Sequence, residues 1–167
     1  MFDYVLINAK VINEGSITEK DIAIKEGRIA RIDQNLGSLP AKRIMDLQGK
    51  YLMPGMIDDQ VHFREPGMPH KGDIFTESRA AISGGITSYM EMPNVNPPTT
   101  TIEALEQKYT IAAERSHANY AFYLGATEDN LEEIKQLDPQ KHCGVKVFMG
   151  ASTGDLLVEA PHALEAI

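Results

Sequence analysis

The stretch that decides the fold reads P-G-M-I-D-D-Q-V-H-F-R-E-P-G and runs from residue 54 to residue 67. A Pro-Gly pair stands at each end, and such pairs are typical of the places where a strand starts and stops. Side chains of a strand alternate between its two faces. In a strand over residues 56–63, every second side chain from residue 58 onward is therefore expected on one face, and these side chains are polar. The members of this row are Asp58, Gln60, His62 and Arg64. The row indicates either the beginning of a metal site or a solvated strand face, and both remain open at this point.

Composition and charge narrow the class of protein. The chain has 167 residues, of which 43% are hydrophobic, and a mean hydropathy of -0.26, so we expect a soluble globular protein with an apolar core. No segment predicts a membrane span, and the first residues lack the basic and apolar runs of a secretory signal, so we expect a cytoplasmic protein with no membrane partner. A net charge of -8 argues against nucleic acid as a partner.

The first fifty residues predict a small β unit. Short apolar runs at 4–7, 11–12, 22–24 and 29–32 predict strands. Glu26-Gly27 separates two alternating runs and predicts a hairpin turn. We therefore expect an antiparallel β unit that ends near Tyr51, and we assign residues 1–52 to it.

From residue 53 onward the pattern alternates between strand and helix, which is the signature of parallel βα units. Asp73 is expected to cap the first helix, and Thr100 with Glu103 has the spacing of a capping box at the start of the second. The expected strands are 56–63, 86–92, 120–124 and 145–149, and the expected helices are 74–83, a helix from about 100, 128–137 and 161–167.

These elements predict an α/β fold, the first half of a (β/α)₈ barrel preceded by part of a small β domain. A complete barrel has eight strands and about 250 residues, whereas residues 53–167 supply about four βα units. The alternatives are an open α/β sheet and the amino-terminal part of a longer protein. The helix that is still running at Ile167 favours the longer protein.

Parallel βα folds collect their chemistry at the carboxyl ends of the strands. Three groups of polar residues meet that rule. They are His62, Arg64 and Glu65 after the first strand, Glu91, Asn94 and Asn96 after the second, and Lys146 in the fourth strand, followed by Ser152, Thr153 and Asp155.

Lys146 is unusual because it lies in the apolar run Gly144-Val145-Lys146-Val147-Phe148-Met149. Burial lowers the pKa of a lysine and makes its amine available for a Schiff base or for reaction with carbon dioxide to a carbamate. A carbamate is an anionic oxygen ligand that can bridge two cations. The alternative is a lysine whose ammonium reaches the strand end and pairs with an acid such as Asp155.

Three motifs together resemble the amino-terminal portion of a dihydroorotase, in the amidohydrolase superfamily that also contains allantoinases and hydantoinases. Each motif is weak alone, and the combination is specific. The resemblance covers the whole chain, since the opening β unit is similar to the start of the family's small composite β domain. The motifs are P-G-M-I-D-D-Q-V-H-F-R-E-P-G at 54–67, E-M-P-N-V-N-P-P-T at 91–99 and G-V-K-V-F-M-G at 144–150.

The resemblance implies a zinc-dependent hydrolase of cyclic amides that interconverts dihydroorotate and N-carbamoyl-aspartate in de novo pyrimidine biosynthesis. It implies one or two zinc ions, a small-molecule substrate and a homo-oligomer. Such a metal lowers the pKa of a water molecule and polarises the scissile carbonyl. An allantoinase or a hydantoinase remains an alternative within the same class.

The family's functional residues match individual positions of this chain. His62 matches the second histidine of the family's H-x-H pair, a metal ligand, and Lys146 matches the lysine that becomes carboxylated and bridges two metals. Arg64 and Asn94 match the pair that holds the substrate carboxylate, a task that suits the two-pronged guanidinium group. The later histidine ligands and the general-base aspartate are expected beyond Ile167, so this piece alone is expected to be inactive.

Gln60 departs from the family pattern, because it stands where the first metal-binding histidine is expected. An amide oxygen is a weaker zinc ligand than imidazole. Gln60 either binds metal through its oxygen, hydrogen-bonds a water molecule, or supports the ligands together with Asp58. A subgroup of bacterial dihydroorotases is similar in D-D-Q-V-H-F, so activity is compatible with the change. The alternative from a different class is a non-catalytic, dihydroorotase-like subunit that assembles with an enzyme.

Overall fold

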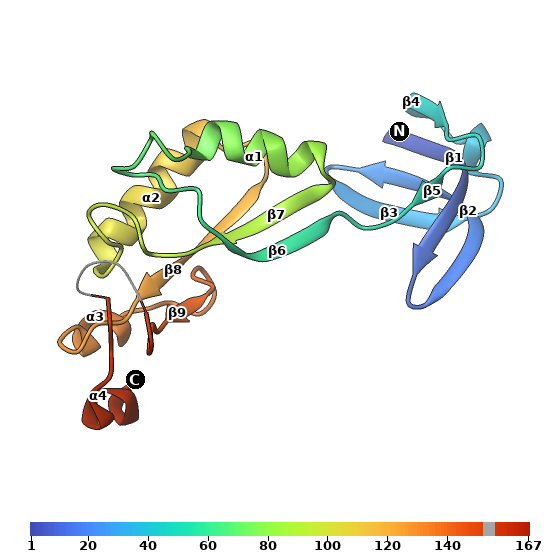
Figure 1. The fold of residues 1–167 in the computed structure, drawn as a ribbon. Helices are drawn as coiled ribbons and strands as arrows, with labels where there is room; N and C mark the ends of the chain where they lie inside the picture. Colours follow the sequence, from blue (N-terminus) through green and yellow to red (C-terminus); the bar gives the residue numbers. More distant parts are fainter. Residues whose placement is uncertain (152–155) are drawn as a thin grey trace. The chain divides into compact units, whose positions relative to one another are not determined.

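The computed structural model describes residues 1–151 and 156–167 and divides the chain into two compact units. The first unit is Met1–Pro54 and the second is Gly55–Ile167, whereas the sequence analysis drew the boundary between residues 52 and 53. Figure 1 shows the first unit in blue and cyan and the second from green to red. Ser152, Thr153 and Asp155 lie outside the described residues, so the structure does not test their predicted place near Lys146.

The first unit is a five-stranded sheet. Its elements are β1 (Phe2–Asn13), β2 (Ser16–Lys25), β3 (Arg28–Asp33), the 3₁₀ helix η1 (Leu36–Ser38), β4 (Ala41–Asp46) and β5 (Tyr51–Leu52). The strand order is β3-β2-β1-β4, with β5 also paired to β1. The core of this unit includes Val5, Ala23 and Leu36.

Two tight turns build this sheet. Glu26 and Gly27 both have positive φ angles, of 53° and 72°, as a two-residue hairpin turn between twisted strands requires. This confirms the predicted hairpin. Glu14 and Gly15 make a similar turn between β1 and β2 that the sequence analysis did not predict.

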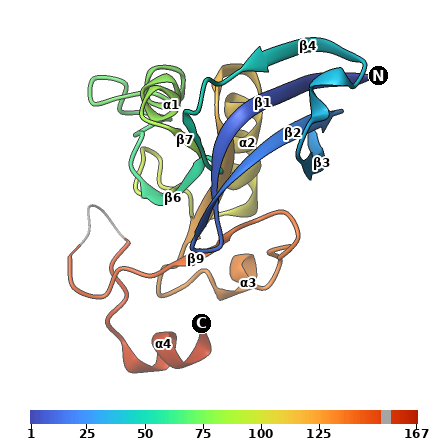
Figure 2. The ribbon, with the colours of Figure 1, turned by 90° about the vertical axis from the view of Figure 1, so that its right-hand side faces the viewer.

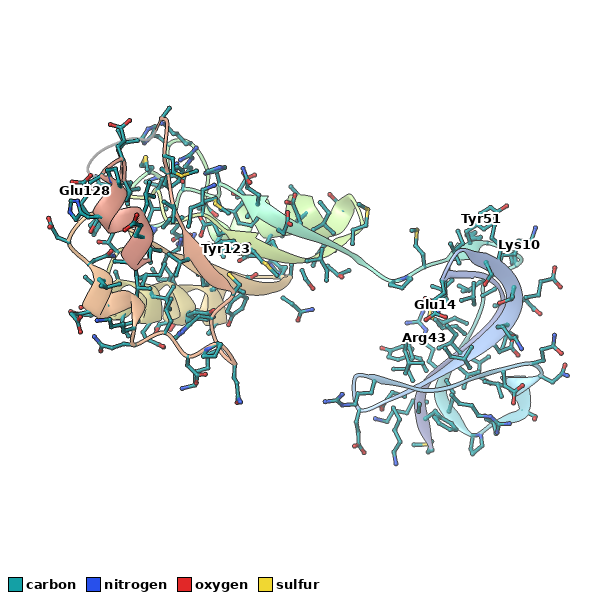
Figure 3. All side chains as sticks on the ribbon, turned by 90° about the horizontal axis from the view of Figure 1, so that it is seen from below. Lys10, Glu14, Arg43, Tyr51, Tyr123 and Glu128 are labelled. Atoms are coloured by element: carbon teal, nitrogen blue, oxygen red, sulfur yellow. The ribbon has the colours of Figure 1, made fainter. Side chains whose placement is uncertain are left out.

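The expectation of an antiparallel unit was wrong in part, because β4 and β5 run parallel to β1. Hairpin signals reveal only neighbouring antiparallel pairs, and the pairing of β4 with β1 is long-range. The same strand β1 also carries a side-chain contact to β5, in which the Lys10 ammonium lies 5.7 Å from the centre of the Tyr51 ring (Figure 3).

The second unit is built from strands and helices in alternation. Its elements are β6 (Met56–Val61), α1 (Ile74–Ser83), β7 (Ile86–Glu91), α2 (Ile102–Arg115), β8 (Asn119–Gly125), α3 (Leu131–Ile134), β9 (Gly144–Lys146) and α4 (Pro161–Ala166). The four strands are parallel in the order β6-β7-β8-β9. This is the half of a (β/α)₈ barrel that the sequence predicts.

Helices α1 and α2 cover one side of the sheet (Figures 1 and 2). α1 packs on β7, α2 packs on β8, and the two helices contact each other. Their apolar faces meet aromatic and aliphatic side chains from the strands. The fully buried members of this core are Ile74, Tyr89, Leu105, Ala112, Phe122 and Leu124.

Helix boundaries match the sequence analysis to different degrees. α1 occupies the predicted residues, and Asp73 caps it by accepting a hydrogen bond from Thr76 N at 2.8 Å. The capping box at Thr100 was wrong, because Thr101 caps α2 by accepting from Ala104 N at 3.1 Å. α3 is shorter than the predicted helix 128–137. None of the helices among the described residues is long and apolar enough to cross a membrane.

Candidate functional site

The candidate site begins where β6 ends, and the strand ends at Val61, earlier than predicted. Between Asp58 and Val61 the register against β7 shifts, so β6 contains a bulge. Asp58 Oδ1 accepts a hydrogen bond from Gln60 N at 3.1 Å, which takes that amide out of the ladder. The prediction that Asp58, Gln60, His62 and Arg64 share one strand face was therefore wrong in its geometry. His62 and Arg64 lie in the loop beyond the strand.

Arg64 is held by main-chain and side-chain contacts from the end of β7. Its φ angle is 70°, a left-handed conformation that costs about 1 kcal/mol or more for a non-glycine residue. Arg64 N donates a hydrogen bond to Glu91 Oε1 at 3.0 Å, and Arg64 Nη1 donates one to the Asn94 carbonyl oxygen at 3.1 Å. The strained backbone is thus fixed by the neighbouring strand, as is common at functional sites.

His62 contacts the same asparagine. Its Nδ1 lies 2.8 Å from Asn94 Oδ1. An amide oxygen can only accept a hydrogen bond, so Nδ1 carries the proton and Nε2 carries the lone pair. This is the tautomer that a metal-binding histidine adopts when a neighbouring oxygen orients its ring.

The surroundings of His62 keep its imidazole neutral. Burial lowers the pKa of His62, and the positive charges of Arg64, Lys146 and Lys108 lower it further, while the hydrogen bond that His62 donates to Asn94 raises it. A pKa below the usual value leaves the ring uncharged at neutral pH. Neutral imidazole is the form that binds metals.

A buried ion pair lies next to these residues. Glu91, at the end of β7, and Lys108, on α2, are each 1% exposed, and Lys108 Nζ lies 2.9 Å from Glu91 Oε2. Burial raises the pKa of the Glu91 carboxyl and lowers that of the Lys108 ammonium, and each charge opposes the shift of the other. The sequence analysis placed Glu91 at the strand end but missed Lys108. The signal was a lysine on the apolar face that Leu105 and Ala112 define.

Lys146 is the last residue of β9 and is half-buried. Its ammonium lies 4.9 Å from the centre of the Phe148 ring, a favourable cation–π distance. Its charge contributes to the lowered pKa of His62, so the two residues are close enough to interact electrostatically. The alternative partner, Asp155, lies outside the described residues.

Two other strand-end candidates serve the fold instead. Glu65 Oε2 accepts from Ile74 N at 2.8 Å, and Glu65 Oε1 pairs with Arg115 Nη1 at 2.6 Å. Asn96 contributes its main chain, because Asn96 N donates to the Pro66 carbonyl at 3.2 Å. Both residues therefore tie the loops after β6 and β7 to the rest of the unit.

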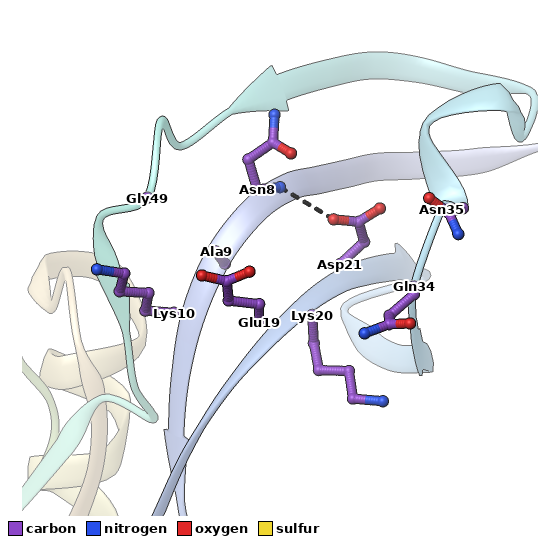
Figure 4. A pocket seen from close by; sticks show the side chains of 9 residues that line it. All are labelled: Asn8, Ala9, Lys10, Glu19, Lys20, Asp21, Gln34, Asn35 and Gly49. Carbon is purple, nitrogen blue, oxygen red and sulfur yellow. Dashed lines mark hydrogen bonds between the residues drawn. The ribbon is translucent and has the colours of Figure 1, made fainter.

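A polar hollow of about 430 Å³ in the first unit looks like a second candidate site (Figure 4). Its buried acid is Asp21. Asp21 Oδ1 accepts from Asn8 N and Asp21 Oδ2 accepts from Leu36 N, both at 2.9 Å. The carboxylate is already used to hold the sheet and η1 together, so this hollow has a structural explanation.

The described residues fit a zinc ion only as part of a larger set of ligands. Within residues 1–151 and 156–167, no three His, Cys, Asp or Glu side chains gather as a metal site. A zinc ion in an enzyme ordinarily has three protein ligands. Here His62 offers one imidazole of suitable tautomer, and the exposed Gln60 and the half-buried Lys146 are the further candidates.

The fold and the residues at its strand ends define a class of protein. This class is the α/β-barrel protein with polar side chains at the carboxyl ends of its strands. A family model described as "Dihydro-orotase-like" matches residues 49–154. The chain belongs to this family. The match confirms the predicted dihydroorotase-like family, whereas the more specific prediction of a dihydroorotase stays a prediction, because the relatives below are named hydantoinase and allantoinase.

Known relatives cover nearly the whole chain. L-hydantoinase from Paenarthrobacter aurescens is 36% identical over 153 residues, which are 91% of this chain and 33% of that protein. Allantoinase from Streptomyces avermitilis is 34% identical over 155 residues, which are 92% of this chain and 35% of that protein. The chain thus spans about a third of the length of these relatives.

A solved structure confirms the fold. The structure of L-hydantoinase (dihydropyrimidinase) from Arthrobacter aurescens matches with a TM-score of 0.93 at 33% identity, over 99% of this chain and 37% of that one. The predicted barrel fold is therefore shown by a relative as well as by the strand order.

Proposed function

We propose that this chain forms part of a zinc-dependent cyclic amidohydrolase whose reaction is the reversible hydrolysis of dihydroorotate to N-carbamoyl-aspartate. The observation that carries the proposal is Arg64, which the end of β7 holds beside Asn94 and His62. A guanidinium has several donors in a planar fork that matches a carboxylate. Within the described residues the guanidinium donates only the hydrogen bond to Asn94, and in the proposal its other donors bind an anionic substrate.

Each residue of the site has a separate task in this proposal. His62 binds zinc through Nε2, and Gln60 binds it through its amide oxygen or orients a water molecule. Lys146 reacts as a neutral amine with carbon dioxide, forming an N–C bond and releasing one proton, and the resulting carbamate is an oxygen ligand. Arg64 and the amide nitrogen of Asn94 hold the substrate carboxylate. Zinc, when bound, polarises a carbonyl and lowers the pKa of a water molecule.

The remaining zinc ligands and the general base come from residues outside these 167 in the proposal. The support is the length of the relatives, of which this chain covers about a third. Activity is therefore expected from the complete polypeptide or from this chain together with a complementing segment.

The test is hydrolytic turnover by the full-length protein with zinc and bicarbonate. We expect interconversion of dihydroorotate and N-carbamoyl-aspartate. Arg64→Ala should raise KM for dihydroorotate about 100-fold, which corresponds to about 2.7 kcal/mol, because the charged hydrogen bonds to the substrate carboxylate are lost. Arg64→Lys is the matched control, because it keeps the positive charge but loses the two-pronged guanidinium group. Its KM for dihydroorotate should lie between those of the wild-type protein and Arg64→Ala.

A hydantoinase or an allantoinase is the second candidate, and the relatives named above favour it. The two candidates differ in substrate charge. Turnover of neutral cyclic amides with no turnover of dihydroorotate, together with an unchanged KM in Arg64→Ala, would overturn the assignment of an anionic substrate. The third alternative is a non-catalytic subunit, which the replacement of the expected histidine by Gln60 motivates. Metal analysis separates it from the two enzymes, because a non-catalytic subunit is expected to bind no zinc and to hydrolyse no cyclic amide.

A further inference from the structure

The buried pair of Glu91 and Lys108 is not explained by the proposed reaction. Both side chains are 1% exposed, and neither reaches solvent. Taking two charges out of water has a free-energy cost that their attraction barely repays, so a well-packed apolar pair is often as stable. Stability alone is therefore a weak reason for this ion pair.

Both charged groups are bonded to the main chain of the candidate site. Glu91 Oε1 accepts from Arg64 N at 3.0 Å. Lys108 Nζ donates to the Met92 carbonyl at 3.3 Å and lies 4.9 Å from the centre of the Phe122 ring. The pair thus connects the loop after β6, which contains Arg64, to the segment after β7, which leads to Asn94.

Arg64 needs such a connection because its backbone is left-handed, with φ at 70°. If Arg64 N lost its acceptor, this amide would no longer hold the backbone in the left-handed region, and Arg64 could adopt the more favourable extended conformation. A change of this dihedral would move the guanidinium away from the Asn94 carbonyl, to which Arg64 Nη1 donates at 3.1 Å.

We propose that the Glu91–Lys108 pair positions the substrate-anion clamp formed by Arg64 and Asn94, with Glu91 fixing the Arg64 main chain and Lys108 fixing Glu91. The two act through Arg64 and touch no substrate. The substrate part of this inference rests on the proposed function, whereas the main-chain part rests on the hydrogen bonds alone. The competing explanation is that the pair merely joins α2 to β7.

Two double variants of the full-length protein separate these explanations. Glu91→Gln with Lys108→Met removes both charges and keeps a carbonyl oxygen that can accept from Arg64 N. Glu91→Leu with Lys108→Met removes both charges and the acceptor. The two variants share the loss of both charges and differ in the side-chain amide at position 91, whose oxygen is the acceptor for Arg64 N. A loss of stability that comes from the missing charges therefore cancels in the comparison.

We expect KM for dihydroorotate to be about tenfold higher in the leucine variant than in the glutamine variant, a difference of about 1.4 kcal/mol. The kcat values should agree within about twofold, and KM for a neutral cyclic amide should be the same in both variants. Equal KM values for dihydroorotate in the two variants would overturn the proposal, because a merely structural pair predicts that result.

Hydrogen exchange gives a readout that requires neither turnover nor a folded variant. In the wild-type protein the Arg64 amide should exchange as slowly as amides of the central strand β7, because a buried carboxylate accepts its hydrogen. Rapid exchange at Arg64 overturns the inference. A protein that protects this amide but hydrolyses no dihydroorotate instead disproves the proposed substrate and leaves the positioning role intact.

Discussion

The end of β9 differs from the ends of β6 and β7 in how its polar side chain is held. At β6 and β7, His62 and Arg64 both contact Asn94, and Glu91 accepts the Arg64 amide. At β9, the Lys146 ammonium lies over the Phe148 ring, and no ion pair within the described part of the chain includes it.

The difference separates two ways of preparing a site. The first two strand ends are organised by hydrogen bonds that exist before any ligand arrives, which lowers the entropy that binding must offset. At the end of β9, by contrast, the contact of the Lys146 ammonium is with an aromatic ring, and the proposed carbamate forms only by reaction with carbon dioxide. We therefore expect variants at β9 to affect the chemistry most and variants near β6 and β7 to affect binding.

The largest effect is expected for Lys146. If its carbamate holds the metals, Lys146→Ala should lower kcat/KM by about a factor of 1000, since several kcal/mol of charge stabilisation by the metal depend on it. Lys146→Arg keeps a positive charge but forms no carbamate, so it should lose as much. Full activity in Lys146→Arg would show that only the charge matters and would break the comparison.

Asp155→Asn is the control for the alternative in which Lys146 pairs with this acid. An ion-pair role predicts that Asp155→Asn and Lys146→Ala have similar effects, whereas a carbamate role predicts a large effect of Lys146→Ala only. Isotope-labelled carbon dioxide gives a direct measurement: a carbamate resonance that disappears in Lys146→Ala is expected.

The sequence predicted regular elements better than their long-range connections. Helix α1 begins and ends at the predicted residues because its cap, Asp73, and its apolar period are local signals. Helix α3 ends early because Gln136 N and Leu137 N donate to carbonyls three residues back, so the helix tightens into turns after Ile134. Pairing of β4 with β1 has no local signal at all.

Three of the candidate residues lie together as expected, although not in the expected geometry, and their roles stay predictions. His62, Arg64 and Asn94 do meet, yet a bulge and a left-handed backbone at Arg64 bring them together, and not the alternation of one strand. Such irregularities depend on tertiary partners such as Glu91 and Lys108. A periodic pattern therefore finds the residue types but not the bonds that aim them.

An intermediate effect on zinc binding is expected for variants of Asn94. These variants test whether the residues at the ends of β6 and β7 are held in place before a ligand binds. Asn94→Ala removes the Oδ1 that orients His62 and should weaken zinc binding by about 10-fold to 100-fold, measured by competition with a chelator. Asn94→Asp keeps an acceptor for His62 but places a negative charge beside Arg64. It should retain zinc and raise KM for dihydroorotate, so equal zinc loss in both variants would contradict the proposed orientation of His62.

The smallest effect is expected for Asp73, at the start of α1 and the end of the loop that begins with the site. Asp73→Ala removes the acceptor for Thr76 N and should lower the free energy of unfolding by about 1 kcal/mol. KM should change by less than about twofold if the site is held by its own hydrogen bonds.

The Thr76 amide lowers the pKa of the Asp73 carboxyl below its ordinary value. The contribution of Asp73 is therefore fully present above the unfolded-state pKa near 3.9 and is lost as the pH falls through the lower folded-state value. Denaturation of wild type and Asp73→Ala between about pH 2 and pH 7 should show the two stabilities converging below about pH 4, while Asp73→Asn, an uncharged cap, should lose less stability at pH 7. A large rise of KM in Asp73→Ala would mean that the helix start, and not the contacts among His62, Arg64 and Asn94, organises the ends of β6 and β7.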